Sequence, residues 1–341
     1  MKFIVKIFTV CLVFAVIQSC KNNSLDIDVS GINLEPLKLQ RLERDVFSIT
    51  AKNIEQNTKN ITAKYGTFYN RFLNGILNNG GIRDTNYQNS VLRFVNDSIM
   101  HDAFNQSQTL FTDVDISKLE DEINLCRKRF KFHFPNRKLP SKLVSYVSGF
   151  NYSVVYIDST IGIGWDMYLG GKNKIYTQML QWPLYKSRTM AKEFIVSDVA
   201  RGWLITEFDN NEPVNNLLNH MIFYGKIFYA CDALLPDVND SLKIGYTTEQ
   251  MKYCKQYEKN LWGFFAEKNR LYENDLKTVS EFTADGPFTA AISKECPPRI
   301  AMWIGWQIVR SYMNNNEKMT VSDLMNEKDS QKILSKSKYR P

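Results

Sequence analysis

The chain has 341 residues, of which 44% are hydrophobic and 13% aromatic, so it can bury a sizeable core and is not intrinsically disordered. Its formal net charge is +7, or +5 without Lys2 and Lys6, and the charges are scattered along the sequence. This excess is too small and too dispersed to indicate nucleic-acid binding, so we expect no nucleic-acid partner.

The first twenty residues are organised like a bacterial lipoprotein signal. Lys2 and Lys6 give a positive start, an apolar run follows over residues 7–17, and Ser19 precedes Cys20. The run is too short to span a bilayer as a helix. We therefore expect residues 1–19 to be a signal peptide and Cys20 to be acylated, as by palmitate. The alternative is an ordinary N-terminal helix.

The residues after Cys20 indicate how the protein is held and where. Residues 20–36 are polar and predict a flexible tether between the lipid and one folded domain over residues 37–341. No later segment is apolar enough to predict a second membrane span. Lys21 stands where lipoproteins of the inner membrane carry Asp. This favours attachment to the outer membrane, with the domain facing the periplasm.

The first part of the domain is predicted to be mainly helical. Leu37, Leu39 and Leu42 suggest a short strand, and helical patterns follow over residues 52–77 and 89–105. The first of these patterns ends at the strong stop signal of residues 78–81. Residues 117–120 fit a capping box, which predicts the start of another helix there.

Short segments rich in Val, Ile and Tyr follow Pro140. They cover residues 143–150, 152–157 and 160–165 and are separated by Gly, Asn and Asp, as in a small antiparallel β-meander. Glycines also occur at 162, 164, 170 and 171. Because Lys172 is followed by Asn173 rather than Ser or Thr, we interpret these as strand and turn glycines rather than a P-loop.

The rest of the chain is predicted to be helical. One amphipathic helix covers residues 194–204, and a nearly all-apolar, central helix follows Glu212 and Pro213. A capping box at residues 247–250 begins a helix that extends to about residue 269. Pro298 opens the last long helix, and Thr320 and Ser330 cap two short closing helices. The predicted fold class is therefore α+β, predominantly helical with a small antiparallel β-meander.

Four cysteines remain beyond the signal and the lipidation site: Cys126, Cys231, Cys254 and Cys296. Three pairings are open to them in an oxidising compartment, and the sequence does not choose among the pairings. We favour buried free thiols because a core of this size needs no cross-links.

The sequence offers no established catalytic or metal-binding motif. Its three histidines, His101, His133 and His220, lack the spacing of zinc ligands, and nucleophile motifs such as G-x-S-x-G are absent. We therefore assign no catalytic residue, metal or cofactor.

Five charged residues are candidates for a cleft or for a structural charge cluster. They are Asp166, Glu193, Asp198, Arg201 and Lys226. Asp166 follows Trp165 at a strand end, where backbone amides can satisfy it. Asp198 and Arg201 are three residues apart, so they share a helix face and can pair. Lys226 interrupts an apolar helix, where it must find a partner or lose its proton.

Three longer segments resemble the gliding-motility lipoprotein GldB family of Bacteroidetes. They are GIGWDMYLG at 162–170, MIFYGK at 221–226 and PRIAMWIGWQIVRSYM at 298–313. The resemblance covers nearly the whole mature chain. It implies a cell-envelope lipoprotein needed for gliding motility, a process tied to type IX secretion, with envelope motility and secretion proteins as partners. It supplies no catalytic residues.

A second similarity, of layout alone, is to zincin-type metallopeptidases. Residues 197–201 would replace the H-E-x-x-H helix, and Tyr224 and Gly225 the third ligand, so every zinc ligand would be lost. Our leading hypothesis is a non-catalytic interaction or scaffold protein. The alternative is an envelope hydrolase or peptide-binding protein on a degenerate, metal-free zincin-like scaffold.

Overall fold

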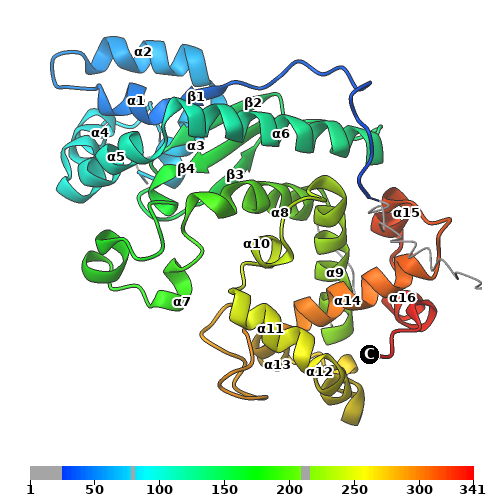
Figure 1. Ribbon diagram of the computed structural model, residues 1–341. Coiled ribbons are helices and arrows are strands. Elements are labelled where there is room, and N and C mark those ends of the chain that lie inside the picture. Colours follow the sequence, from blue (N-terminus) through cyan, green and yellow to red (C-terminus); the bar gives the residue numbers. More distant parts are fainter. Residues whose placement is uncertain (1–24, 78–80, 209–215) are drawn as a thin grey trace, which may run out of the picture.

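The computed structural model describes residues 25–77, 81–208 and 216–341, and within them a small sheet is surrounded by helices (Figure 1). The predicted α+β class with predominant helix is confirmed. The strands are β1 (Leu39–Arg41), β2 (Lys142–Tyr146), β3 (Val154–Ile157) and β4 (Thr160–Gly164). The helices up to β2 are α1 (Leu42–Phe47), α2 (Ile54–Tyr65), α3 (Thr67–Gly75), α4 (Tyr87–Asn96), α5 (Ser98–Leu110) and α6 (Asp113–His133).

The helices after the sheet form the second half of the molecule. The longer ones are α8 (Ile195–Glu207), α9 (Leu217–Leu234), α11 (Thr248–Gln256), α12 (Glu258–Ala266), α13 (Leu276–Thr283), α14 (Ile300–Asn314) and α16 (Ser330–Ser337). The shorter ones are α7 (Leu184–Ser187), α10 (Asp240–Ile244) and α15 (Val321–Asn326).

The sheet is mixed, with strand order β1-β2-β4-β3, and not the antiparallel meander that the sequence predicted. Only β3 and β4 form an antiparallel hairpin, whereas β2 pairs with β4 and with β1 in parallel. The turn at Asp158 (φ +54°) joins β3 tightly to β4. On its other side, β4 pairs with β2, so β3 is an edge strand of the sheet. The fully buried β4 therefore lies between β2 and β3.

Two long helical patterns in the first half are each divided in the structure. Gly66, at φ +55°, separates α2 from α3. Asp97 separates α4 from α5 because its carboxylate caps α5, accepting from the amides of Ile99 and Met100. The predicted stop at 78–81 falls largely on residues outside the described part. The predicted short strand is β1.

The helix predicted to start at 117–120 begins one turn earlier. The structure places the capping box at Thr112, whose hydroxyl accepts from the amide of Asp115 while Asp115 accepts from the amide of Thr112. The first turn of α6 is thereby satisfied before residue 117. The prediction was wrong because two overlapping capping patterns occur here, and the earlier one is used.

The predicted helix starts in the second half are mostly confirmed. Thr247 and Gln250 form the expected capping box, although α11 ends at Gln256 and α12 begins afresh at Glu258. α9 is buried along most of its length, as its apolar sequence predicted. The short α16 is capped by Asp329 rather than by Ser330, and α14 starts just after Pro298.

The chain before β1 lies along α6, as the dark blue segment in Figure 1 shows. Val29 is buried there, and a guanidinium nitrogen of Arg127 donates to the carbonyl oxygen of Glu35 at 3.0 Å. Residues 25–36 of the predicted tether therefore contact the helix. The predicted signal peptide, residues 1–19, and the predicted lipidation site Cys20 lie outside the described residues. No helix in the described part is long and apolar enough to cross a membrane.

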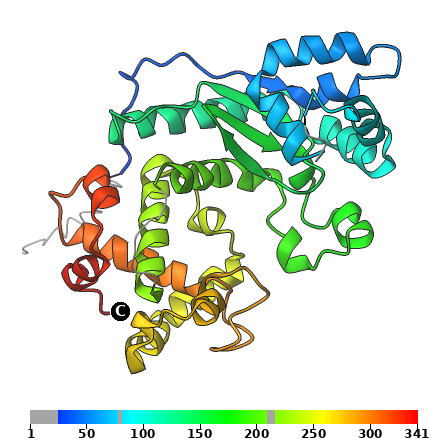
Figure 2. The ribbon, with the colours of Figure 1, turned by 180° about the vertical axis from the view of Figure 1, so that it is seen from behind.

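The described residues form three hydrophobic clusters, and the one in the second half contains the crossing of α9 and α14, visible in both ribbon views (Figures 1 and 2). Two glycines, Gly225 on α9 and Gly305 on α14, allow the backbones to touch there. Cys126, Cys231, Cys254 and Cys296 are buried, unpaired thiols. Burial raises the pKa of Cys126 and Cys231 to about 12, so both thiols stay protonated and unreactive at neutral pH.

Candidate functional site

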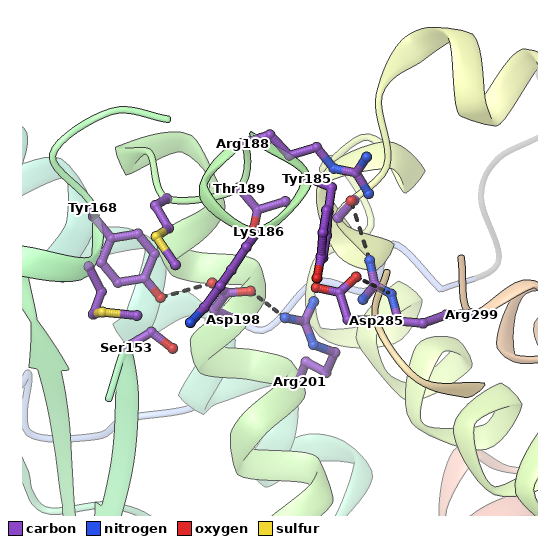
Figure 3. A pocket seen from close by; sticks show the side chains of 13 residues that line it. Ser153, Tyr168, Tyr185, Lys186, Arg188, Thr189, Asp198, Arg201, Asp285 and Arg299 are labelled. Carbon is purple, nitrogen blue, oxygen red and sulfur yellow. Dashed lines mark hydrogen bonds and ion pairs between the residues drawn. The ribbon is translucent and has the colours of Figure 1, made fainter. Parts of the chain in front are cut away.

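Asp198 and Arg201 lie side by side on α8 and form the predicted ion pair. The other carboxylate oxygen of Asp198 accepts a hydrogen bond from the hydroxyl of Tyr168 at 2.8 Å. The second arm of Arg201 donates to the carbonyl oxygen of Lys243, on α10, at 2.7 Å. The pair therefore links the segment after β4, α8 and α10. Figure 3 shows the contacts of Asp198 with Tyr168 and Arg201.

The surroundings fix the charge states of this group. Burial opposes the positive charge of Arg201, but the adjacent Asp198 carboxylate outweighs burial and raises the pKa of Arg201. Burial, together with the same carboxylate, raises the pKa of Tyr168 well above its usual value. Tyr168 therefore remains a protonated donor at neutral pH. Each oxygen of Asp198 thus has one hydrogen-bonded donor, and the two donors, Tyr168 and Arg201, hold the carboxylate in place.

A cavity of about 280 Å³ opens beside this pair. It lies between the segment after β4, the chain around α7, the first half of α8 and the approach to α14 (Figure 3). Its charged lining residues are Lys186, Arg188, Arg201, Arg299, Asp198 and Asp285. Four cations therefore face two carboxylates. Sequence reasoning found only Asp198 and Arg201, because the others come from segments distant in the chain.

Arg188 and Arg299 differ in how their charges are compensated. The Nε of Arg299 lies 3.6 Å from a carboxylate oxygen of Asp285. The Nε and Nη2 of Arg188 are buried without a hydrogen-bond partner. Burial and the positive charge of Arg299 lower the pKa of Arg188 by more than the nearby Asp285 carboxylate raises it. Among the described residues, this edge of the Arg188 guanidinium thus has no hydrogen-bonded counter-ion.

Asp166 is fully buried and is not among the residues that line the cavity. Its carboxylate accepts hydrogen bonds from the backbone amide and hydroxyl of Ser148, at 2.7 and 2.9 Å, and from the amide of Phe150, at 2.6 Å. Burial raises the pKa of Asp166 to about 6, against the effect of these donors. Asp166 thereby holds the turn after β2, in which Gly149 and Phe150 both have positive φ.

Glu193 and Lys226 do not join the cavity either. Glu193 is exposed in a short 3-10 helix before α8. Lys226 is buried on α9, and its Nζ donates to the carbonyl oxygen of Glu327, just after α15, at 2.8 Å. The five predicted residues therefore do not form one cluster: Asp198 and Arg201 meet, and the other three lie elsewhere.

Of the positions proposed to match the third zincin ligand, Gly225 is used for packing. Gly225 lies against Gly305, where an added Cβ would come within 2.3 Å of the Gly305 carbonyl oxygen. Tyr224 is half-buried and does not line the cavity. In the described part of the chain, no three His, Cys, Asp or Glu side chains are grouped so as to hold a metal ion.

A second charge cluster, which sequence reasoning missed, joins α9, α10 and α14. Asp232 accepts from Lys243 at 2.8 Å, from Trp306 at 2.9 Å and from two nitrogens of Arg310 at 2.8 and 2.9 Å. Arg310 also binds both carboxylate oxygens of Asp240. Burial opposes the charge of Arg310, but these hydrogen bonds raise its pKa. The sequence did offer a signal for this cluster: Asp232 and Arg310 each lie in a mostly apolar helix, where a charge needs a partner.

The fold and this site define a mainly helical α+β protein. Most of the buried charged side chains described above join one helix or loop of the protein to another. The chain belongs to the gliding motility protein GldB family, whose model matches residues 22–341. Searches among curated proteins and among solved structures gave no match.

Proposed function

We propose that this gliding motility protein is a lipid-anchored, non-catalytic interaction or scaffold component of the envelope apparatus, attached through Cys20 to the outer membrane and facing the periplasm. Its partners are envelope motility and secretion proteins. The observation that carries the non-catalytic assignment is the engagement of Asp198, whose two carboxylate oxygens are held by Tyr168 and Arg201. A group so engaged serves to position three segments of the chain.

A second candidate function is an envelope hydrolase or a peptide-binding protein on a metal-free, zincin-like layout. The observation that favours it is the position of Asp198 and Arg201 on a helix that packs against the edge strand β3 and lines a cavity. The two candidates differ in what Asp198 does. Replacing a structural residue lowers the stability of the protein. Replacing a general base abolishes the reaction, because the new side chain cannot accept the proton.

Substitution of the pair distinguishes these functions. We expect Arg201→Met to lower the free energy of unfolding by about 3 kcal/mol, because it leaves the largely buried Asp198 without its cation, and to reduce motility in parallel. The double variant Asp198→Leu with Arg201→Met should recover part of the stability. Thermal unfolding of the purified chain and colony spreading of complemented cells measure the two effects.

A matched control is the exposed pair Lys118–Glu122 on α6, whose charged atoms are 3.9 Å apart. Lys118→Met should change neither stability nor spreading, since exposed ion pairs contribute little. Loss of motility in Asp198→Asn with an unchanged melting temperature would contradict the structural role and favour the hydrolase.

The anchoring proposal has its own test. We expect a clickable fatty acid to label the protein in cells and the label to disappear in Cys20→Ser, with the protein leaving the membrane fraction. Cys126→Ser, which changes a buried thiol, is the control and should keep the label. A Cys20→Ser protein that still carries the label and still sediments with membranes would refute lipid attachment at this residue.

A further inference from the structure

The cavity beside α8 has an unbalanced charge. Asp198 is paired with Arg201, and Asp285 lies near Arg299. Lys186 is exposed, and its Nζ lies over the face of Trp182, 3.8 Å from the ring centroid. In the described part of the chain, Arg188 forms no ion pair within 4 Å, although the Asp285 carboxylate acts on its charge from farther away. The described lining therefore has two more cations than carboxylates.

The uncompensated atoms of Arg188 are the ones best suited to an oxyanion. Nε and Nη2 form one edge of the guanidinium and are both without a hydrogen-bond partner. This edge is the fork that binds carboxylates and phosphates through two parallel hydrogen bonds. Leaving it unpaired in a buried position is costly, and the neighbouring charge of Arg299 adds to the cost.

The other lining groups suit a tetrahedral anion. Arg188, Arg201 and Arg299 approach the same space from three separate segments, with Tyr185 among them (Figure 3). The hydroxyl groups of Ser153 and Thr189 also line it. Donors from several directions match a group with three terminal oxygens better than a planar carboxylate, which offers two.

We propose that this cavity binds the phosphate group of a small phosphorylated molecule, with Arg188 as the principal contact and Lys186 and Arg299 completing the charge. A phosphate monoester carries about two negative charges near neutral pH, which equals the excess of cations in the lining. The volume of about 280 Å³ exceeds what a bare phosphate needs but leaves no room for acyl chains. This site goes beyond the proposed interaction or scaffold role and does not depend on that role.

Calorimetric titration of the full chain in detergent tests the site. The probes are inorganic phosphate, glycerol 3-phosphate, succinate and dihexanoyl phosphatidic acid, which carries the same monoester on a lipid. We expect both phosphate and glycerol 3-phosphate to bind, glycerol 3-phosphate more tightly, and succinate at least tenfold more weakly. Arg188→Gln should weaken glycerol 3-phosphate binding by at least tenfold. Arg188→Lys, which keeps the charge but loses the fork, should be intermediate.

Two controls separate a binding defect from misfolding. Arg83→Gln removes an exposed arginine that does not line the cavity and should leave binding unchanged. Without ligand, Arg188→Gln should melt at or above the wild-type temperature, because it removes an uncompensated charge. Saturating glycerol 3-phosphate should raise the melting temperature of wild type but not of Arg188→Gln.

The other outcomes would overturn the proposal. These are an absence of binding by every probe, equal binding of succinate, or unchanged binding by Arg188→Gln. Arg188-dependent binding of the phosphatidic acid alone would instead assign the cavity to a lipid headgroup. Failure of phosphate binding would leave the motility and stability results for Asp198 and Arg201 unaffected, so the two ideas are tested separately.

Discussion

Replacing Asp232 with alanine is expected to lower the free energy of unfolding by about 3–5 kcal/mol. This carboxylate is 5% exposed and neutralises both Lys243, which is 3% exposed, and Arg310 on α14. Its removal leaves two largely buried cations with Asp240 as their remaining acidic partner, and it also removes the acceptor of the Trp306 indole. Urea denaturation followed by circular dichroism measures the change.

The control for Asp232 is Glu122→Ala, which removes an acidic group of an exposed ion pair. It should change the free energy of unfolding by less than about 1 kcal/mol. Asp232→Asn should be intermediate, because the amide keeps one acceptor oxygen but loses the charge. Similar small effects of Asp232→Ala and Glu122→Ala would show that the cluster does not hold α9, α10 and α14 together.

Gly305→Ala is expected to destabilise the protein by about 3 kcal/mol or more, because it adds a methyl group where two helices already touch. The new Cβ would lie 1.8 Å from the carbonyl oxygen of Met221 on α9. The obstacle is backbone, so no side-chain rotation relieves it, and α9 and α14 must move apart at the centre of the core. Thermal unfolding and the yield of folded protein measure the effect.

Gly263, on α12, provides the matched control. An added Cβ there meets no atom within 4 Å. Because alanine favours helix more than glycine does, Gly263→Ala should raise stability by about 0.5–1 kcal/mol. Gly225→Ala, on the other side of the crossing, should behave like Gly305→Ala. If Gly305→Ala unfolds at the wild-type temperature, the close contact of α9 and α14 is wrong.

Much of the secondary structure could be predicted because its signals are local. Apolar spacing placed the buried α9, and the side-chain pattern at Thr247 and Gln250 placed the start of α11. The pairing of Asp198 with Arg201 was equally predictable, since helix geometry brings residues three apart onto one face. Local signals failed where two of them competed, as at Thr112 and Ser117, or where one residue such as Gly66 divides a longer pattern.

The family was also indicated by the sequence alone, because long, uncommon segments of the chain carry it, and a match over residues 22–341 shows it. Strand order was decided only by the tertiary structure. The segments 143–150, 152–157 and 160–165 have strand composition, but composition does not encode which strand lies at the edge. The parallel pairing of β2 with β4 follows from how the chain passes between them.

The tertiary structure alone decided the charge clusters. Asp232 and Arg310 are 78 residues apart, and the cavity gathers Arg188, Arg201 and Arg299 from three segments. Charges at such separations meet only after apolar helix faces have packed, because burial drives the packing and is not directional. The sequence by itself therefore determined where most of the helical segments lie, the ion pair between Asp198 and Arg201, and the family. The partners of the isolated buried charges were determined by the packing of α8, α9 and α14.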